Sequence, residues 1–258
     1  MCTNVKERAP LVSVIMPAYN AERFIEEAIN SVVNQTVEDW ELIVIDDGSA
    51  DSTFEIVNTY AQKDPRIRAF INEKNMGVAK TRNRGLDLAR GKYVALLDSD
   101  DYWKPQLLEK MLYRSQETSA DIVYCSYEMV DEGGQKVCND FIVPLETTYE
   151  ESMVRSVITC SSVLITADLV RKNHFPTNMY HEDIALWFQL LRDGVVARGV
   201  TEVLAVYRQV TNSRSAGKIK SACRRWKIYR EHLKLPFFKS VWIMARYAYY
   251  GLVKFKRI

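Results

Sequence analysis

Three carboxylates, Asp98, Asp100 and Asp101, directly follow the apolar run Tyr93–Leu97. Clustered like charges repel one another and are costly to desolvate, so they are tolerated best at the end of an element, facing water or a cation. Asp98 and Asp100 are separated by one residue, so in an extended segment their side chains leave on the same side and can converge on one hard ion. The alternative is an acidic turn that caps a helix beginning near Lys104. This stretch alone does not decide between the two.

The first hundred residues alternate between short apolar runs and helical patterns. The runs lack strict alternation, as parallel strands covered on both faces do, and predict strands at Leu11–Met16, Trp40–Ile45, Ile67–Ile71 and Lys92–Leu97. Helices are expected between them, one capped by Asn20, one opened by a Ser52 and Glu55 capping box, and one from Asn75 to about Arg90. Such alternation predicts a right-handed, mostly parallel α/β sheet. Polar clusters at Pro17–Asn20, Asp46–Ser49 and Asp98–Asp101 would then share the carboxyl edge of that sheet, where ligands bind.

The pattern loosens in the second half of the chain. Further elements are expected as a helix over Lys104–Thr118, strands at Asp121–Tyr127, Ser162–Ile165 and Val203–Tyr207, a Thr148 and Glu151 capping box, and a helix after His181-Glu182-Asp183.

Charge is distributed unevenly along the chain. The formal net charge is +2, but the segment from Lys218 onward holds 12 Lys and Arg against one acid, which leaves about −9 on residues 1–217 and about +11 on the rest. The acidic body disfavours nucleic acid as the main partner, whereas the basic tail suits an anionic surface.

Cysteine usage and hydropathy indicate a cytoplasmic protein. The five cysteines are odd in number and form no C-x-x-C pair, which favours reduced thiols over a disulfide framework or a zinc site. The amino terminus has no apolar signal core, and no apolar run approaches the ~20 residues of a spanning helix.

Common nucleotide-binding motifs are missing from the sequence. No G-x-G-x-x-G follows the first strand and no G-x-x-x-x-G-K-[ST] occurs, which disfavours dinucleotide oxidoreductases and P-loop enzymes. A bound phosphate would therefore need a metal ion, and Asp98 and Asp100 are the residues suited to hold one.

Five motifs occur in a recognisable order: VIMPAYN, VIDDGSAD, NMGVAKTRNRG, LLDSDD and HEDIALW. Together they closely resemble the family 2 glycosyltransferases of the GT-A fold, over Leu11 to about Ser215. The resemblance implies an α/β catalytic domain at 1–217, with a mostly parallel sheet flanked by helices. Its nucleotide-binding half would span about 10–103 and its acceptor-binding half about 104–217, followed by an amphipathic helical tail at 218–258. The implied activity is transfer of a sugar from a nucleotide diphosphate donor with inversion of anomeric configuration.

The same resemblance assigns the donor site. Donor contacts are expected from Pro17, Ala18, Tyr19, Asn20, Asp46, Asp47, Arg82, Asp98, Ser99 and Arg208. Tyr19 would lie against the base and Asp47 would accept its imide N–H. Asp100 would bind Mg²⁺ or Mn²⁺ against the diphosphate, Asp98 would contact either the ribose or that ion, and Asp101 would cap the next helix. Left open are a core position for Tyr19, a solvated basic helix face for Arg82, and a surface position for Arg208.

Asp183 is the expected general base, by resemblance to the aspartate that follows a glutamate in the family motif. It would deprotonate an acceptor hydroxyl that attacks the anomeric carbon, so that no covalent nucleophile is needed. The alternative is an acid that only stabilises a helix amino terminus. Acceptor contacts are expected from Trp103, Glu182 and Trp187, with a buried core position as the alternative for Trp187. The segment Ser213-Arg214-Ser215 is expected to close over the donor.

A helical pattern begins at Pro236. The apolar residues on one face of this helix are Phe237, Val241, Met244, Ala248, Leu252 and Phe255. The basic residues on the opposite face are Lys239, Arg246, Lys254 and Arg257, and Trp242 and Tyr249 lie between the two faces. This pattern is typical of a helix lying on anionic lipid; the alternative is packing on the catalytic domain or on a dimer partner. A membrane location fits a lipid-linked acceptor in bacterial surface polysaccharide synthesis. The enzyme would then be peripheral at the inner face of the cell membrane and would transfer a hexose or N-acetylhexosamine from a UDP-sugar.

Two rival functions follow from the same residues. A phosphatase-like hydrolase would use Asp46 or Asp47, but that chemistry wants two acids two residues apart after the first strand, and these are adjacent after the second. An inactive sugar-nucleotide-binding module would have little reason to carry Asp183 together with the metal pair.

Overall fold

A computed structural model describes residues 8–210 and 218–255, with side chains described for residues 8–210 and 221–250. The strands are β1 (Val12–Ala18), β2 (Trp40–Asp46), β3 (Ile67–Ile71), β4 (Tyr93–Leu96), β5 (Tyr102–Trp103), β6 (Ile122–Val130), β7 (Val163–Thr166) and β8 (Ala197–Arg208). The helices are α1 (Ile25–Val33), α2 (Thr53–Lys63), α3 (Val78–Leu88), α4 (Leu107–Thr118), α5 (Tyr149–Val154), α6 (Ala167–Lys172), α7 (Glu182–Arg192), α8 (Lys218–Lys227) and α9 (Phe237–Phe255). A 3₁₀ turn, η1 (Cys160–Ser162), and a π-helical turn, η2 (Ile228–His232), complete the set.

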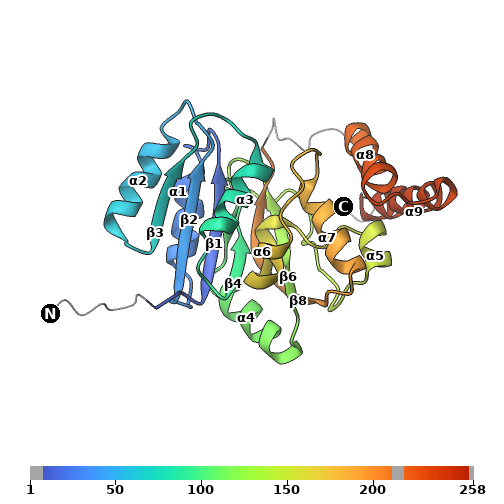
Figure 1. The fold of residues 1–258 in the computed structure, drawn as a ribbon, viewed down its shortest axis with the longest axis horizontal. Coiled ribbons are helices and arrows are strands. Elements are labelled where there is room, and N and C mark those ends of the chain that lie inside the picture. The colour runs from blue at the N-terminus through green and yellow to red at the C-terminus, as the bar shows by residue number, and fades with distance from the viewer. Residues whose placement is uncertain (1–7, 211–217, 256–258) are drawn as a thin grey trace.

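One sheet with the strand order β3-β2-β1-β4-β7-β6-β8-β5 runs through the molecule (Figure 1). Strands β3, β2, β1 and β4 are all parallel, and we call them the parallel half. In the mixed half, β7, β6, β8 and β5, only β6 and β8 pair in parallel. The prediction of a parallel sheet is therefore confirmed for the first four strands, while the second half is mixed.

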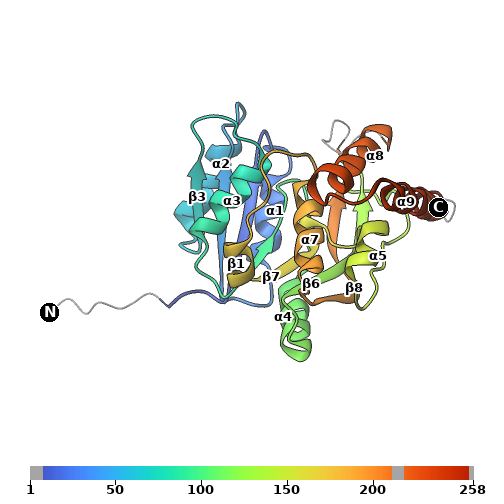
Figure 2. The ribbon, with the colours of Figure 1, turned by 45° about the vertical axis from the view of Figure 1, so that its right-hand side comes forward.

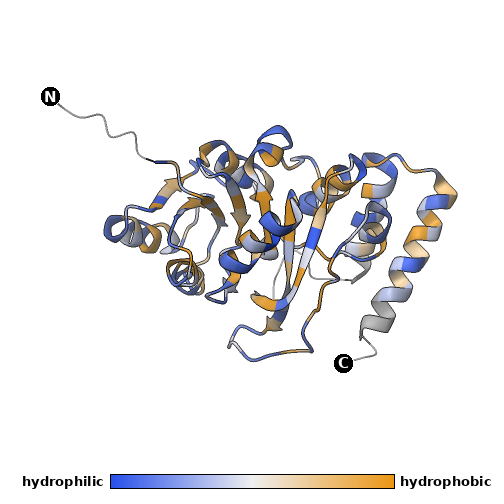
Figure 3. Ribbon diagram, turned by 90° about the horizontal axis from the view of Figure 1, so that it is seen from below, coloured by the Kyte–Doolittle hydropathy of each residue, from blue (hydrophilic) through white to orange (hydrophobic). Residues whose placement is uncertain are grey.

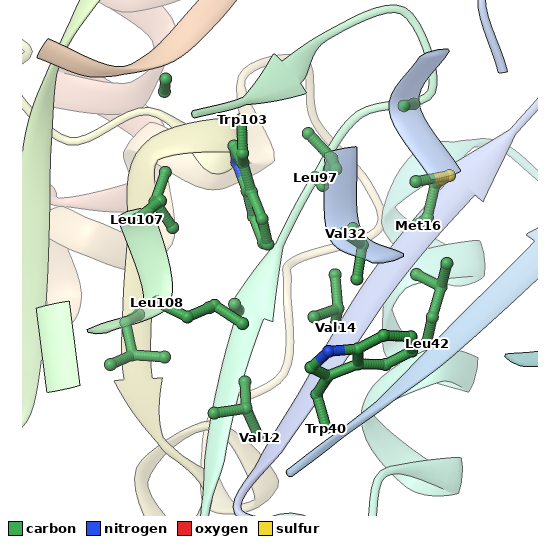
Figure 4. Packing of buried hydrophobic residues seen from close by; sticks show 14 of the residues in the cluster. Val12, Val14, Met16, Val32, Trp40, Leu42, Leu97, Trp103, Leu107 and Leu108 are labelled. Atoms are coloured by element: carbon green, nitrogen blue, oxygen red, sulfur yellow. The ribbon is translucent and has the colours of Figure 1, made fainter. Parts of the chain in front are cut away.

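Helices cover both faces of the sheet, which explains why the strands are mostly apolar. Val12, Val14 and Met16 of β1 point to a core formed with α1, α2 and α4, as Figure 4 shows for part of this cluster. Ile15 points to the opposite core, which is formed with α3, α6 and α7. Side chains alternate between the faces of a strand, so a strand covered on both faces needs an apolar residue at nearly every position.

The helix starts test the predicted caps. The Thr148 and Glu151 capping box at α5 is confirmed. The Ser52 and Glu55 box is wrong, because the Ser52 side chain makes no capping bond and the neighbouring Asp51 accepts the backbone N–H of Thr53 instead. Asn20 does not cap α1 either, since that helix begins five residues later at Ile25.

The basic tail packs on the end of the catalytic domain beyond α5 and α7 (Figures 1 and 2). Ser240 and Ile243 of α9 are buried there, with Met244 partly buried beside them. Packing on the catalytic domain, the alternative for this helix, is therefore confirmed. The predicted apolar face is wrong, because Met244 faces the domain whereas Val241 is exposed. Within the described ranges no helix is long and apolar enough to cross a membrane.

Candidate active site

The predicted polar clusters meet at one edge of the parallel half. Strands β2, β1 and β4 are neighbours in the sheet, and their carboxyl ends lead into residues 46–49, 19–20 and 98–101. Tyr19 is 50% exposed there, so a core position for it is wrong and its side chain is accessible to a ligand. Pro17 and Ala18 lie within β1 and are buried, so this cluster offers a ligand its backbone and the Tyr19 ring.

The loops after β1 and β2 are tied to each other. The backbone N–H of Asn20 donates to Ser49 Oγ at 2.9 Å, and Asn20 Oδ1 accepts the N–H of Ala50 at 2.9 Å. Buried Asp46 accepts the backbone N–H of Ser49 at 3.1 Å and also its hydroxyl. Asn20 and Asp46 thus fix the two loops together, and their contact with a donor stays a prediction.

Asp47 is buried and binds the start of α3. Its Oδ2 accepts the backbone N–H of Gly77 at 2.8 Å, and its Oδ1 accepts the N–H of Met76 at 2.9 Å and the Asn72 amide at 2.7 Å. The first N–H groups of a helix lack intrahelical partners, and a carboxylate there is also favoured by the helix dipole. Asp47 therefore supports the turn into α3, and its predicted contact with a nucleobase would have to share the carboxylate with these bonds.

Residues 98–101, which we call the acidic loop, expose two of their three carboxylates. Asp98 and Asp100 are half-buried, as is Ser99, whereas Asp101 is buried. Asp101 accepts the hydroxyl of Ser161 and, at 2.8 Å, the backbone N–H of Arg208. The prediction that Asp101 caps the next helix is wrong, because its oxygens hold the loop against η1 and the end of β8.

Asp100 fits the role of metal ligand. Burial and the neighbouring Asp98 raise the pKa of Asp100 to about 6, because bringing two carboxylates together disfavours their ionisation. A divalent cation would relieve that repulsion, and carboxylate oxygens are the ligands that Mg²⁺ and Mn²⁺ prefer. Among the described residues no three His, Cys, Asp or Glu side chains form a cage. The pair would thus need further oxygens from a ligand such as a diphosphate.

Arg82 of α3 joins Asp98 and Glu182, which lie 84 positions apart in the sequence. One guanidinium nitrogen donates to Asp98 at 2.6 Å and another to Glu182 at 2.8 Å, and the side chain is 4% exposed. A solvated basic face for Arg82 is therefore wrong. Direct pairing with a donor is disfavoured as well, because its charge is already balanced by two carboxylates. Arg82 instead fixes the acidic loop relative to the amino terminus of α7.

Asp183 lies in the first turn of α7, beside Glu182. Burial raises the pKa of Asp183, and Asp98 raises it further, while the Arg82 guanidinium opposes the shift. The charges of Asp98 and Arg82 act on Asp183, which places the predicted base in the same electrostatic neighbourhood as the acidic loop. A raised pKa also makes a carboxylate a better proton acceptor.

Arg208 lies beneath the acidic loop rather than beside an open pocket. It is 4% exposed, its Nε donates to the Asp100 carbonyl at 3.0 Å, and its Nη2 donates to Glu27. The guanidinium also lies 4.7 Å from the centre of the Phe24 ring and 5.5 Å from that of Tyr102. A surface position for Arg208 is therefore wrong. The contacts of its guanidinium indicate that it supports the acidic loop, which disfavours the predicted pairing with a diphosphate.

Neither predicted tryptophan offers a surface for a sugar. Trp103 is buried, its Nε1 donates to the Ser161 carbonyl at 2.7 Å, and Figure 4 shows its ring among Leu97 and Leu107. Trp187 is buried edge-on to Phe175, with 6.0 Å between ring centres. The expectation that these residues contact an acceptor is wrong in this structure, and the core alternative for Trp187 is correct.

Ser161 is the residue that the sequence did not reveal. Its hydroxyl donates to Asp101 and accepts the backbone N–H of Asp98, while its carbonyl accepts Trp103. Only a short polar triplet before an apolar strand marks it in the sequence. The segment Ser213-Arg214-Ser215 lies outside the described residues.

Comparisons with known proteins identify relatives of this chain. A family model described as glycosyl transferase family 2 matches residues 13–137. The putative teichuronic acid biosynthesis glycosyltransferase TuaG of Bacillus subtilis is 39% identical over 239 residues, 93% of this chain and 95% of the relative. The UDP-Glc:alpha-D-GlcNAc-diphosphoundecaprenol beta-1,3-glucosyltransferase WfgD of Escherichia coli is 32% identical over 95% of this chain and 94% of the relative.

A solved structure shares the fold. Residues 1–349 of S. aureus TarS in complex with UDP-GlcNAc superpose with a TM-score of 0.74 at 23% identity, covering 92% of this chain and 71% of that one.

Proposed function

The chain belongs to glycosyltransferase family 2, has the GT-A fold and is a glycosyltransferase, and from this premise we propose its substrates and mechanism. The donor is a UDP-sugar, and the transferred group is a hexose or N-acetylhexosamine. The acceptor is a hydroxyl of a lipid-linked glycan in surface polysaccharide synthesis. Transfer proceeds by a single displacement that inverts the anomeric configuration.

The observation that carries the proposal is the bridge through Arg82. This side chain bonds Asp98 of the acidic loop and Glu182 of α7 at the same time. The bridge therefore brings together the two groups that an inverting transfer needs, a carboxylate pair for a metal-bound diphosphate and a base for the acceptor. A module that only bound a sugar nucleotide would need no base at this position.

Asp183 is the general base of the proposed reaction. The acceptor hydroxyl loses its proton to Asp183 as its oxygen attacks the anomeric carbon from the face opposite the nucleotide. Asp98 and Asp100 would hold Mg²⁺ or Mn²⁺, which supplies positive charge against the departing diphosphate. Arg82 and Glu182 orient the two carboxylate groups relative to each other, and alignment of this kind can contribute several kcal/mol to a displacement.

The relatives support the choice of substrates. WfgD is named for a UDP-glucose donor and an acceptor joined to undecaprenol through a diphosphate, and it aligns over nearly the whole of both chains. TarS binds UDP-GlcNAc on the same fold. An acceptor anchored in a bilayer would require the enzyme to work at a membrane surface, and we place it there as a peripheral protein.

A panel of nucleotide sugars tests the proposal. The purified chain is incubated with Mn²⁺, each donor, and either water or a short prenyl-diphosphate-linked sugar, and both nucleotide release and glycosylated product are measured. We expect one UDP-sugar to give product only with the acceptor present. Binding of UDP without turnover of any donor would indicate a binding module, and release of phosphate from donor or acceptor would indicate a hydrolase.

A further inference from the structure

Helix α9 has two apolar faces, one packed against the domain and one exposed. Its inner face packs in a cluster with α5, α7 and η2 through Ser240, Ile243 and Met244. On the other side, Phe238, Trp242 and Tyr249 are 85%, 57% and 64% exposed. Trp242 follows Phe238 by four positions and Tyr249 follows Trp242 by seven, so the three side chains lie on one side of the helix, where they form an aromatic stripe.

The outer face of α9 comprises Phe238, Val241, Trp242, Ala245 and Tyr249, all of which are exposed. Figure 3 shows the helix at the outer end of the molecule, with apolar and polar residues alternating along it. Scattered single apolar residues are normal on protein surfaces, but several exposed aromatic residues on one helix face indicate a surface that binds a partner or a membrane.

The charges beside this stripe are all positive. Lys239 and Arg246 fall on one flank of the outer face, and the Arg246 guanidinium lies 4.7 Å from the centre of the Trp242 ring. After Glu231 the sequence contains six Lys and Arg and no Asp or Glu. Aromatic side chains with polar tips beside cations are typical of helices that lie in the interface of an anionic bilayer.

The inner face holds α9 firmly to the catalytic domain. Arg225 of α8 donates to the Met153 carbonyl at 2.9 Å and to the Tyr229 hydroxyl at 2.7 Å. Its guanidinium also lies 4.3 Å from the centre of the Tyr247 ring of α9. Tyr229 stacks on Phe188 of α7, the helix whose first turn carries the proposed base. A surface bound by the outer face of α9 would therefore be held in a fixed relation to α7.

We propose that the outer face of α9, with Lys239 and Arg246, docks on an anionic lipid bilayer and lies parallel to it. The proposal deepens the proposed function, because it names the surface through which the enzyme would approach a membrane-anchored acceptor. Charge complementarity selects the bilayer over a second copy of this chain, since two copies would bring like charges together. The helix would lie in the headgroup region with its apolar stripe inward.

Sedimentation of the full chain with vesicles tests the proposal. The chain is mixed with phosphatidylcholine vesicles and with vesicles that also contain phosphatidylglycerol, and the bound fraction is measured. The double variant F238S/W242S should bind anionic vesicles about 10- to 100-fold more weakly, because it loses most of the aromatic stripe. Tyr113→Ser, on the exposed side of α4, is the matched control and should bind like the wild type.

A charge variant tests whether the chain binds anionic lipid through Lys239 and Arg246. K239Q/R246Q should bind anionic vesicles about 10- to 30-fold more weakly, because each surface cation near an anionic leaflet contributes about 1 kcal/mol. The proposal would be overturned if the wild type failed to bind anionic vesicles, or if F238S/W242S bound them as tightly as the wild type does. A wild-type dimer that F238S/W242S converts to a monomer, without vesicle binding, would assign the face to a second copy. Release of UDP from the donor should be unchanged in all of these variants, so failure of the docking surface is distinguishable from failure of the proposed function.

Discussion

The two halves of the sheet contribute different kinds of residue to the site. The parallel half ends in groups that face the open rim, including the exposed Tyr19 and the half-buried Asp98 and Asp100. The mixed half supplies Asp183 and also the buried residues Ser161 and Arg208, which hold the acidic loop from behind. The parallel half therefore presents the proposed ligand-binding groups, and the mixed half adds the proposed base and holds the acidic loop in place.

This comparison shows why a short acidic motif is not a site by itself. Asp101 is held by Ser161 and Arg208, which are 60 and 107 positions away in the sequence. The shape of a four-residue loop thus depends on packing in the opposite half of the molecule. Apart from the proposed base Asp183, substitutions in the mixed half should change stability and geometry, while substitutions of Asp98 and Asp100 at the end of the parallel half should change binding and catalysis.

Replacing Trp103 should have the largest effect on the stability of the protein. Trp103→Ala removes a buried ring and its bond to Ser161, which should lower the free energy of unfolding by about 3–5 kcal/mol. The control is Trp242→Ala on the outer face of α9, which should change it by less than about 0.5 kcal/mol. Chemical denaturation measures both. Equal small losses, together with a raised KM for the acceptor in Trp103→Ala, would restore Trp103 as a sugar-binding residue.

Asp100→Asn should disrupt the proposed metal site at the end of the parallel half. The amide keeps the shape but loses the charge, so transfer should fall about 10²- to 10³-fold. Affinity for UDP should also lose its dependence on Mn²⁺. Initial rates and calorimetric titrations at several Mn²⁺ concentrations measure these effects. The control is Asp168→Asn, an exposed acid on α6, and equal activity of the two variants would place the metal elsewhere.

Arg82→Lys tests whether Arg82 positions other side chains or binds the donor directly. Lysine keeps the charge but cannot bond Asp98 and Glu182 with a planar fork, so kcat should fall about 10- to 100-fold. Because Arg82 is bonded to the protein, the Kd for UDP should change little. If the Kd for UDP rose as much as kcat fell, Arg82 would instead be a donor contact.

The pH dependence should show the smallest effect. In the proposed mechanism the ionised form of Asp183 is the active one, and burial raises the pKa of Asp183 from the ordinary value of 3.8. Activity should therefore fall as the pH decreases, along a limb of the kcat/KM profile that lies above pH 3.8, measured at saturating Mn²⁺. Arg82→Lys keeps the opposing charge and should leave this limb in place. A limb at or below pH 3.8 would mean that another group accepts the proton.

Much of the parallel half could be predicted from the sequence. Its strands are short apolar runs because both faces are covered, and the predicted third strand, Ile67–Ile71, matches β3 at both ends. The acidic clusters were correctly placed at the carboxyl edge, because that edge follows from strand direction alone. Helix caps were harder to predict from the sequence. Asp51 and Ser52 compete for the same backbone N–H groups, and the sequence alone does not determine which of them accepts the bond.

Burial of single side chains could not be predicted. Arg82, Arg208 and Trp103 all resemble ligand contacts in the sequence, yet each is enclosed by residues far away along the chain. The prediction of which face of α9 is buried was wrong for the same reason. The turn η2 and helix α5 pack against α9 and determine which side of the helix is covered. Periodicity predicts that a helix has an apolar side, but α9 has two apolar sides and only packing separates them.

The most direct test of the account is Asp183→Asn. Transfer from the UDP-sugar to the lipid-linked acceptor is measured in a single turnover, beside a calorimetric titration of UDP with Mn²⁺. The account predicts a loss of about 10²- to 10⁴-fold in the rate of transfer, with UDP binding as in the wild type, because the base acts on the acceptor and not on the donor. A rate of transfer within about twofold of the wild type would contradict the assignment of Asp183 as the base.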